Sequence, residues 1–430
     1  KTIRTAWFLR KIIAPNQRKV EFVYRPSTIP SVGYNYDYVY TSGDPSLVLI
    51  QDMIGITQGS PELSERGMET GPFLSLQDKN DFTYELVRQS SLDKIIVDGK
   101  TVIQFYYKEK ERTFYADNEI VQSLYKAFNK KNMQMIGIDV SYDNTVIKKI
   151  SLQQEYLGTS SNSRLFLTSL VCGENKYSFD YYNLDKIPRP CLTEIDHWGY
   201  YNGKPYLIPH LKVSMDGMNI IIDDDKQRVA DEELCKVGML RKVLYPTGGE
   251  SLFYYGLHSW NYMVRRGYST QEEVSDNFPG EAFPREIGGA RINKIEDVDM
   301  NGNVVNTREF IYNKGILLGY PNYLKEIFPI RPNAIFADFY TNIMGKSTYP
   351  NEKYIQYAEV TEKNSTNGST TFRFTSYLDV DNRDQFDITP ATYSKILVDS
   401  YDQWPPLLGF RGDNRSYRRG LLTEKIHYDN

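Results

Sequence analysis

The residues of this sequence that come closest to a chemical constellation are Asp196, His197 and Trp198, within the stretch EIDHWGYYNGK. An aspartate can orient an imidazole, and an aromatic ring beside them can stack on the face of a sugar. Successive side chains of an extended chain point to opposite sides, however, so Asp196 and His197 do not easily form a dyad in a strand. We therefore expect a structural corner in which His197 and Trp198 pack and Asn202-Gly203 turns the chain.

A second candidate is an acidic stretch that resembles the first half of an EF-hand calcium loop. It contains Asp297, Asp299 and Asn301-Gly302, but the position of the bidentate glutamate is taken by Arg308. Without that ligand the loop lacks its strongest calcium contact. Asn-Gly is also a common β-hairpin turn, so we expect a hairpin here and no metal.

Other catalytic and cofactor signatures are missing from the sequence. The four histidines are scattered singly, and the three cysteines, Cys172, Cys191 and Cys235, show no CxxC spacing. No phosphate-binding glycine loop or nucleophile elbow is present. We therefore expect no catalytic residue, no metal and no cofactor. Glycoside hydrolysis stays open, because it needs only two facing carboxylates and the chain has 55 acidic residues.

Composition favours a folded, β-rich chain. Of the 430 residues, 40% are hydrophobic and 25% charged, and 35 are tyrosines, which suit wide and half-exposed sheets. The net charge of −4 argues against nucleic acid, because no basic stripe is present to bind phosphates. No apolar run approaches the roughly 18 residues that a membrane-spanning helix needs.

The elements that must position any site are β-hairpins that recur along the chain. Each copy has an apolar strand with interleaved Lys or Arg, a turn, and a second strand that ends in aromatic residues. The copy from Met239 to Tyr255 is the clearest, with Gly248-Gly249 in its turn. Further copies are expected at residues 8–24, 92–107, 164–182, 289–312 and 355–377, with strands at 34–40, 47–51, 135–142 and 146–156.

Five glycines are assigned a structural role in these motifs. Gly248 and Gly249, like Gly288 and Gly289, sit where hairpins need residues that accept unusual backbone angles. Gly199 belongs to the Asp196 corner. Short helices are expected at 117–131, 226–237, 321–328 and 390–401, and a long polar loop at 55–72.

The chain ends on residues 420–430, which match the first strand of another copy without its return strand. Both ends therefore look cut from a longer array, or else one end pairs with the other. We expect a hairpin array at 1–190 with one helical insertion and its continuation at 191–430, which could also form one continuous domain.

Taken together, these motifs resemble the large surface or secreted proteins of Bacteroidetes-type bacteria with YD-type repeats of the rearrangement-hotspot (Rhs) kind. The resemblance spans almost the whole chain, and the order of the motifs agrees. IDHWGYYNGK and YPTGG, the latter followed by GGARI, carry it most strongly; the others are WFLRKIIAPNQRKVEFVY, LDKIIVDGKTVIQFYY, RLFLTSL with YSFDYYN, and GLLTEKIHYD.

The resemblance implies a mainly β fold in which successive antiparallel hairpins form a large extended or curved sheet, an open or partial Rhs-like shell with a few short helices. It implies a non-enzymatic scaffold of an exported cell-surface or secreted protein, with the remainder of the polypeptide or a payload domain as partner. The alternative is a carbohydrate-binding surface module. In that case Trp198 and Trp260 are the residues expected to stack on glycans.

Overall fold

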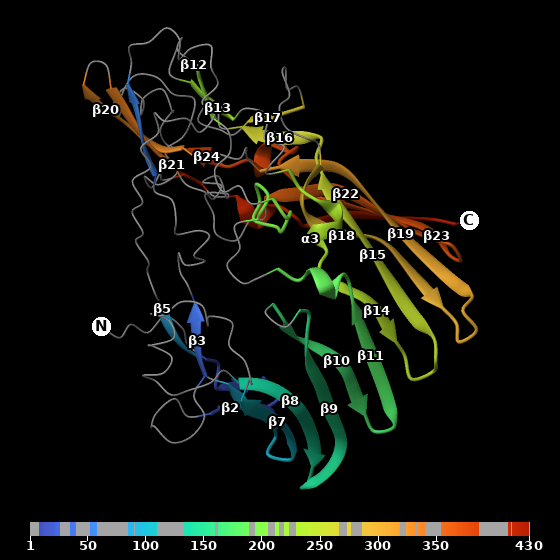
Figure 1. Cartoon of the computed structure of the whole chain (residues 1–430). Coiled ribbons are helices and arrows are strands. Elements are labelled where there is room, and N and C mark those ends of the chain that lie inside the picture. The colour runs from blue at the N-terminus through green and yellow to red at the C-terminus, as the bar shows by residue number, and fades with distance from the viewer. Residues whose placement is uncertain are drawn as a thin grey trace.

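Successive hairpins build a mainly β protein in the computed structural model of the chain (Figure 1). The strands of the hairpins join one large antiparallel sheet that is not closed, as the sequence predicts. The structure describes residues 8–25, 35–39, 52–57, 85–89, 91–109, 133–159, 162–188, 194–204, 211–214, 219–222, 229–265, 273–276, 286–318, 324–331, 334–339, 354–386, 412–413 and 415–429.

Seven hairpins follow one another in the described part of the chain, and their turns have two to five residues. Each hairpin pairs its second strand with the first strand of the next, and the last strand, β26 (Leu422–Tyr428), pairs with the seventh hairpin. The two strands of each hairpin are β1 (Lys11–Ile13) and β2 (Lys19–Tyr24), β6 (Leu92–Val97) and β7 (Thr101–Glu109), β8 (Met133–Tyr142) and β9 (Thr145–Leu157), β10 (Arg164–Cys172) and β11 (Asn175–Tyr181), β14 (Leu240–Leu244) and β15 (Glu250–Ser259), β18 (Glu286–Val298) and β19 (Val304–Leu317), and β22 (Ile355–Asn364) and β23 (Gly368–Phe374).

A β-bulge recurs at six of the seven junctions between the second strand of one hairpin and the next first strand. Each bulge places one extra residue on the first strand, directly after an apolar residue such as Leu92 or Leu240. An extra residue on one strand bends the pair and increases its twist. At three of the six sites a lysine follows the apolar residue two places later: Lys94, Lys242 and Lys294. The extra residues are Asp93, Ile136, Thr168, Arg241, Asn293 and Thr423.

A tyrosine closes four of the hairpins at the same place. In the second hairpin, the Tyr107 hydroxyl donates to the Leu92 carbonyl over 2.8 Å, and in the first, Tyr24 donates to Leu9 over 3.0 Å. Tyr181 and Tyr312 do the same for Leu167 and Ile292, at 2.7 and 2.8 Å. We call this contact the tyrosine clasp. It gives the aromatic residues of the second strand a structural role in these four hairpins.

The ends of the strands lie along two opposite sides of the sheet, and these two sides carry different elements. Because neighbouring strands are antiparallel, all the hairpin turns lie along one edge, the turn edge, and all the connections between hairpins lie along the other, the insertion edge (Figure 1). The insertion edge carries smaller sheets: β3 (Asn35–Val39) with β5 (Glu85–Gln89), β4 (Asp52–Thr57) with β20 (Leu324–Arg331) and β21 (Ala334–Phe339), β12 (Leu211–Ser214) with β13 (Asn219–Ile222), and β24 (Gln385–Phe386) with β25 (Gly412–Asp413).

The two faces of the sheet also differ in the first hairpins. One row across the strands is apolar, and we call its side of the sheet the apolar face. The next row holds charged and amide side chains and marks the charged face. The apolar row is Phe22, Ile95, Ile103 and Val140, and it ends at Lys148 on β9. The charged row is Lys94, Gln104, Asp139 and Lys149, and it begins at Val23 on β2.

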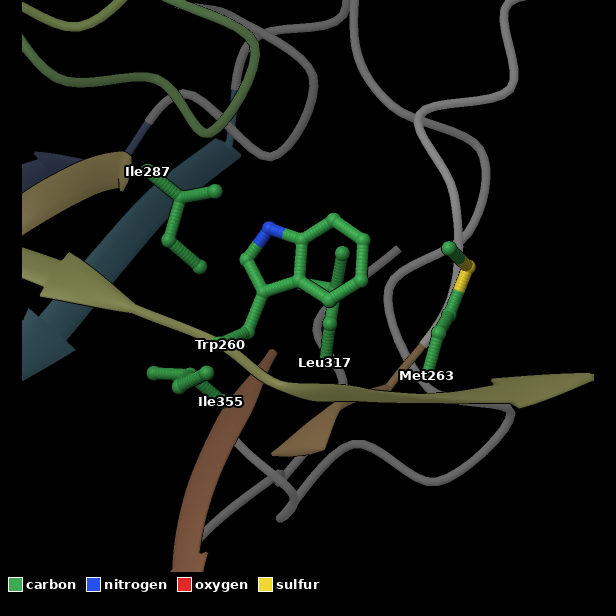
Figure 2. Close-up of a cluster of buried hydrophobic side chains, with 5 residues drawn as sticks. All are labelled: Trp260, Met263, Ile287, Leu317 and Ile355. Atoms are coloured by element: carbon green, nitrogen blue, oxygen red, sulfur yellow. The ribbon is translucent and has the colours of Figure 1, made fainter. Parts of the chain in front are cut away.

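The buried core lies at the insertion edge of the later hairpins. Trp260 is only 2% exposed and packs with Met263, Ile287, Leu317 and Ile355, as Figure 2 shows. Beside it lie β16 (Tyr262–Arg265), which runs parallel to the end of β19, and β17 (Glu273–Ser275). A second cluster follows directly and consists of Val264, Ile316, Leu318, Ala358 and Tyr377.

The expected short helices had mixed outcomes. Residues 226–237 contain a one-turn helix, α3 (Glu232–Cys235), whose N-cap Asp231 accepts the backbone N–H groups of Glu233 and Leu234 at 2.9 Å. The helix expected at 321–328 was wrong, because Leu324–Arg331 forms β20, whose backbone pairs with β21. The helices expected at 117–131 and 390–401 lie outside the described residues, as do residues 58–72 of the loop expected at 55–72; residues 55–57 belong to the strand Asp52–Thr57 and not to a loop.

The sheet passes from the first expected region to the second without a break, because β11 pairs with β14 across residue 190. At its ends, β1 pairs with β2 and β26 pairs with β23. Among the described strands β1 and β26 do not pair with each other and the sheet is not closed, so the expectation that one end of the array pairs with the other is wrong.

Candidate functional site

The Asp196 corner is a tight turn closed by its own aspartate. Oδ1 of Asp196 accepts the backbone N–H groups of Trp198 and Tyr200 at 2.8 and 2.9 Å, and the backbone N–H of Asp196 donates to the Tyr200 carbonyl at 2.7 Å. Gly199 has a φ of 87°, which few other residues adopt readily. Asp196 and His197 are almost fully buried, at 0% and 2% exposure. One carboxylate oxygen of Asp196 therefore serves the turn itself.

The corner docks on two glycines inside β18. A Cβ atom on Gly288 would overlap Oδ2 of Asp196, and one on Gly289 would meet the Tyr354 hydroxyl and the Tyr200 ring. Gly289 also has a φ of 89°, next to an irregular step in the pairing of β15 with β18. The sequence pattern suggested that these glycines lie in a hairpin turn. In the structure they lie inside β18 instead. They permit the close approach of another part of the chain.

Tyr354 joins the corner to the sheet. Its hydroxyl donates to the Gly288 carbonyl over 2.6 Å and lies 3.2 Å from the Tyr200 hydroxyl. Its ring centre is 6.1 Å from those of Trp198 and Tyr200. Burial, followed by the hydrogen bond to Tyr200, raises the pKa of Tyr354 far above its ordinary value. The phenol therefore remains a neutral hydrogen-bond donor.

A second tyrosine, Tyr357, gathers the polar groups next to this contact. Its hydroxyl accepts the backbone N–H of Ser259 at 3.1 Å and a hydrogen bond from the Arg291 guanidinium, and lies 3.1 Å from Nδ1 of His258. The guanidinium also lies 4.6 Å from the ring centre of Tyr312. Burial raises the pKa of Tyr357. These contacts link the strands β15, β18, β19 and β22.

The two tryptophans expected to stack on glycans lie in different environments. Trp260 is part of the core and its ring is covered by apolar side chains (Figure 2). Trp198 is only partly buried and packs against the outside of the same cluster. Of the two, only Trp198 has exposed surface to offer a ligand.

The Gly248-Gly249 turn needs its glycines for two different reasons. Gly248 has a φ of 86°, and its N–H donates to the Tyr245 carbonyl at 3.0 Å. Gly249 does not have a positive φ, but a Cβ there would lie 3.0 Å from the Val298 carbonyl of the adjoining strand. One glycine therefore serves the turn and the other serves the packing of neighbouring hairpins.

The acidic stretch after β18 is a hairpin turn. Oδ1 of Asp299 accepts the backbone N–H groups of Asn301 and Asn303, both at 2.8 Å. These bonds, above all those from Asn303, lower the pKa of Asp299. Asp297 accepts the Ser251 hydroxyl over 2.6 Å. The carboxylates are thus engaged within the hairpins.

Sequence reasoning missed Tyr354, which receives the corner, and the neighbouring group of Tyr357, His258 and Arg291. They come from different connections and strands, and no local pattern marks them. It also missed a buried ion pair between Asp384 and Arg419, with Oδ1 and Nη1 at 2.8 Å. Of the residues around Arg291, only Tyr312 could be found from the sequence, because it belongs to the repeated aromatic residues of the second strands.

The expectations about metal ligands, cysteines and membrane-spanning helices can be compared with the described residues only. Among the described residues, no group of three or more His, Cys, Asp or Glu is placed to hold a metal ion. Cys172 and Cys235 are free thiols, and burial raises the pKa of Cys235 to about 12, whereas Cys191 lies outside the described residues. Within the described ranges, no helix has the length and apolar character to cross a membrane.

No protein-family model matches this chain, and no curated protein matches it significantly. The resemblance to Rhs and YD-repeat proteins therefore stays a prediction from the motifs.

Proposed function

We propose that this chain is a non-enzymatic β-scaffold segment of an exported bacterial cell-surface protein with YD/Rhs-like repeats. Its sheet presents or encloses another part of the same polypeptide or a payload domain. Support comes from the repeated hairpins with their bulges and tyrosine clasps, and from a candidate site whose polar groups are used to hold the strands together.

The observation that carries the proposal is the half-buried apolar face of the first hairpins. The row Phe22, Ile95, Ile103 and Val140 runs across four strands, yet every one of these side chains keeps some exposed surface. Apolar side chains gain free energy when they leave water, at about 25 cal/mol per Å². A continuous apolar strip on a sheet therefore favours a partner that covers it.

Photo-crosslinking in the full-length secreted protein tests this proposal. A photoreactive amino acid at Ile103, on the apolar face, should crosslink to one discrete site in the same polypeptide or in its payload. The matched position is Lys149, on the charged face, which should give little product. Equal crosslinking from both positions, or none from Ile103, would overturn the proposal.

The alternative, a carbohydrate-binding module, now depends on Trp198. A glycan array probed with the wild-type chain and with Trp198→Ala tests it. Glycan binding that disappears in Trp198→Ala, while the thermal unfolding midpoint is kept, would favour the module over the scaffold.

A further inference from the structure

The dipeptide Asn-Gly occurs three times in the sequence, with its asparagine at Asn202, Asn301 and Asn367. In this dipeptide the side-chain amide is open to attack by the next backbone nitrogen, because glycine has no Cβ that hinders the approach. The three glycines have positive φ values of 71°, 85° and 79°, in the same order. The dipeptides and the backbone of their glycines are therefore alike, and their surroundings decide how fast each one reacts.

Asn301 lies in the turn that joins β18 to β19. Asn301 is exposed together with both its neighbours, Met300 and Gly302, and Met300 keeps 75% of its surface. A Cβ atom on Gly302 would have no other atom within 4 Å, so the space beside this residue is open. The Gly302 N–H donates to the Asp299 carbonyl at 3.1 Å, a bond that water can replace when the turn opens. Exposed turns open locally at a small cost in free energy.

Asn202 has the opposite environment, inside the Asp196 corner. It is only 2% exposed, and both ends of its side-chain amide are hydrogen-bonded. Nδ2 donates to the Val229 carbonyl over 3.2 Å, and Oδ1 accepts the backbone N–H of Lys204 at 3.0 Å. The backbone N–H of Asn202 also donates to the Glu194 carbonyl at 3.1 Å. Attack on this amide requires it to leave buried partners, which costs more free energy than opening an exposed turn.

Asn367 combines features of the other two sites. It is exposed in the turn between β22 and β23, as Asn301 is in its own turn. Gly368, whose nitrogen would attack the amide, is buried and is the first residue of β23, where it pairs with Asn364. The attacking nitrogen is therefore less accessible than that of Gly302, and we expect an intermediate rate.

We propose that Asn301 is a site of spontaneous deamidation, which reacts faster than Asn367 and much faster than Asn202. The Gly302 nitrogen bonds to Cγ of Asn301, the Cγ–Nδ2 bond breaks, and the proton of the Gly302 nitrogen leaves with Nδ2 as ammonia. Water then opens the cyclic imide. Attack of water on Cγ gives aspartate, and attack on the main-chain carbonyl carbon gives isoaspartate. Neither step oxidises or reduces any atom.

The isoaspartate product changes the contact between two hairpin turns. Its main chain passes through Cβ and Cγ and is one atom longer, so the bond from the Gly302 N–H to the Asp299 carbonyl loses its geometry. The turn of the neighbouring hairpin is close, because a Cβ on Gly248 would lie 3.3 Å from Cβ of Met300. Deamidation at Asn301 therefore loosens the turn edge between β15 and β18.

Peptide mapping by mass spectrometry tests the site on the intact chain, aged at mildly alkaline pH in heavy-oxygen water. The peptide with Asn301 should convert to labelled aspartate and isoaspartate. The peptide with Asn202 should convert about tenfold more slowly or less, and the one with Asn367 at a rate in between. Conversion of Asn202 as fast as Asn301 would overturn the proposal, as would an intact Asn301 beside a converted Asn367.

The same chain unfolded in urea is the control for local sequence. Once the surroundings are lost, the three dipeptides should convert at similar rates. If Asn202 stays slow in urea, its neighbours in the sequence protect it, and the assignment of its slow reaction to burial is wrong.

The variant Asn301→Ser tests the consequence for the turn. It removes the reactive amide and leaves Gly302 in place. Ageing should accelerate hydrogen exchange at 299–303 in the wild-type chain and leave it unchanged in Asn301→Ser. Equal acceleration in both chains would show that deamidation at Asn301 does not loosen this turn.

Discussion

The hairpins from β1 to β11 and those from β14 to β26 share one repeat but differ in how their side chains are buried. In the described part of residues 8–181, the buried side chains are the polar Gln134, Ser163 and Ser169. From residue 187 onward the structure contains a hydrophobic core around Trp260 and Ile316. The same backbone pattern therefore occurs with and without a sealed core.

The presence of a hydrophobic core in the later hairpins arises from contacts at the insertion edge. In the later hairpins, connections bring Trp260, Tyr354 and the Asp196 corner onto the ends of β18, β19 and β22. The strand ladder, the bulge and the tyrosine clasp depend on neighbours within one hairpin pair. The hairpin repeat thus shapes the sheet, and contacts between distant connections create the core.

The largest expected effect comes from Trp260→Ala. Removing a buried tryptophan should lower the free energy of unfolding by about 3–5 kcal/mol. Hydrogen exchange should accelerate in β15, β18 and β19 and stay slow in β6 to β9. Phe105→Ala, in the half-buried apolar face, is the matched change and should cost about 1–2 kcal/mol. If urea titrations gave the same loss of unfolding free energy for Trp260→Ala and Phe105→Ala, the contrast between the two regions would be wrong.

Gly288→Ala should have the next largest effect, because the new methyl group would overlap the Asp196 carboxylate. We expect a loss of about 3 kcal/mol, as for overpacked cores, with faster exchange at 194–204. The control is Gly302→Ala, at a turn with a φ of 85° and no atom within 4 Å of the new Cβ. That variant should lose only about 1 kcal/mol through its backbone angle. A larger loss in Gly302→Ala would show that close approach is not the role of Gly288.

Tyr107→Phe tests the clasp in the region without a sealed core. Losing its hydrogen bond to the Leu92 carbonyl should cost about 1 kcal/mol. The neighbouring Tyr106 hydroxyl makes an exposed contact of 3.3 Å with Asp139, so Tyr106→Phe should leave the denaturation midpoint unchanged. The clasp would have no structural role if both variants matched the wild-type chain.

The smallest expected effect is a pH dependence at the turn edge. Asp98 accepts the backbone N–H of Lys19 at 2.7 Å and the Arg18 side chain at 2.9 Å, and these bonds, the first above all, lower its pKa below 3.8. A carboxylate whose pKa is lowered by folding stabilises the folded state fully when the pH is above 3.8. This contribution is lost as the pH falls through the pKa of the folded state. Exchange in β1 and β2 should accelerate on acidification below pH 4. The Asp98→Asn variant should lack this step, and an identical step in it would assign the effect to another group.

Much of the fold could be predicted from local sequence. The Asp98-Gly99 turn has φ values of 50° and 70°, and the hairpin around it forms at the predicted residues. The expected helix at 321–328 failed because pairing with β21 outweighs local preference. Gly288 and Gly289 were recognised as structural, but the reason is the docked Asp196 corner and not a turn.

The sequence by itself determined the hairpins and their turns, because these depend on residues a few places apart. Only the tertiary structure decided that Trp260 is buried and that Tyr354 receives the Asp196 corner. Those outcomes depend on contacts between residues tens to more than a hundred positions apart, and no local pattern encodes which distant surfaces will meet.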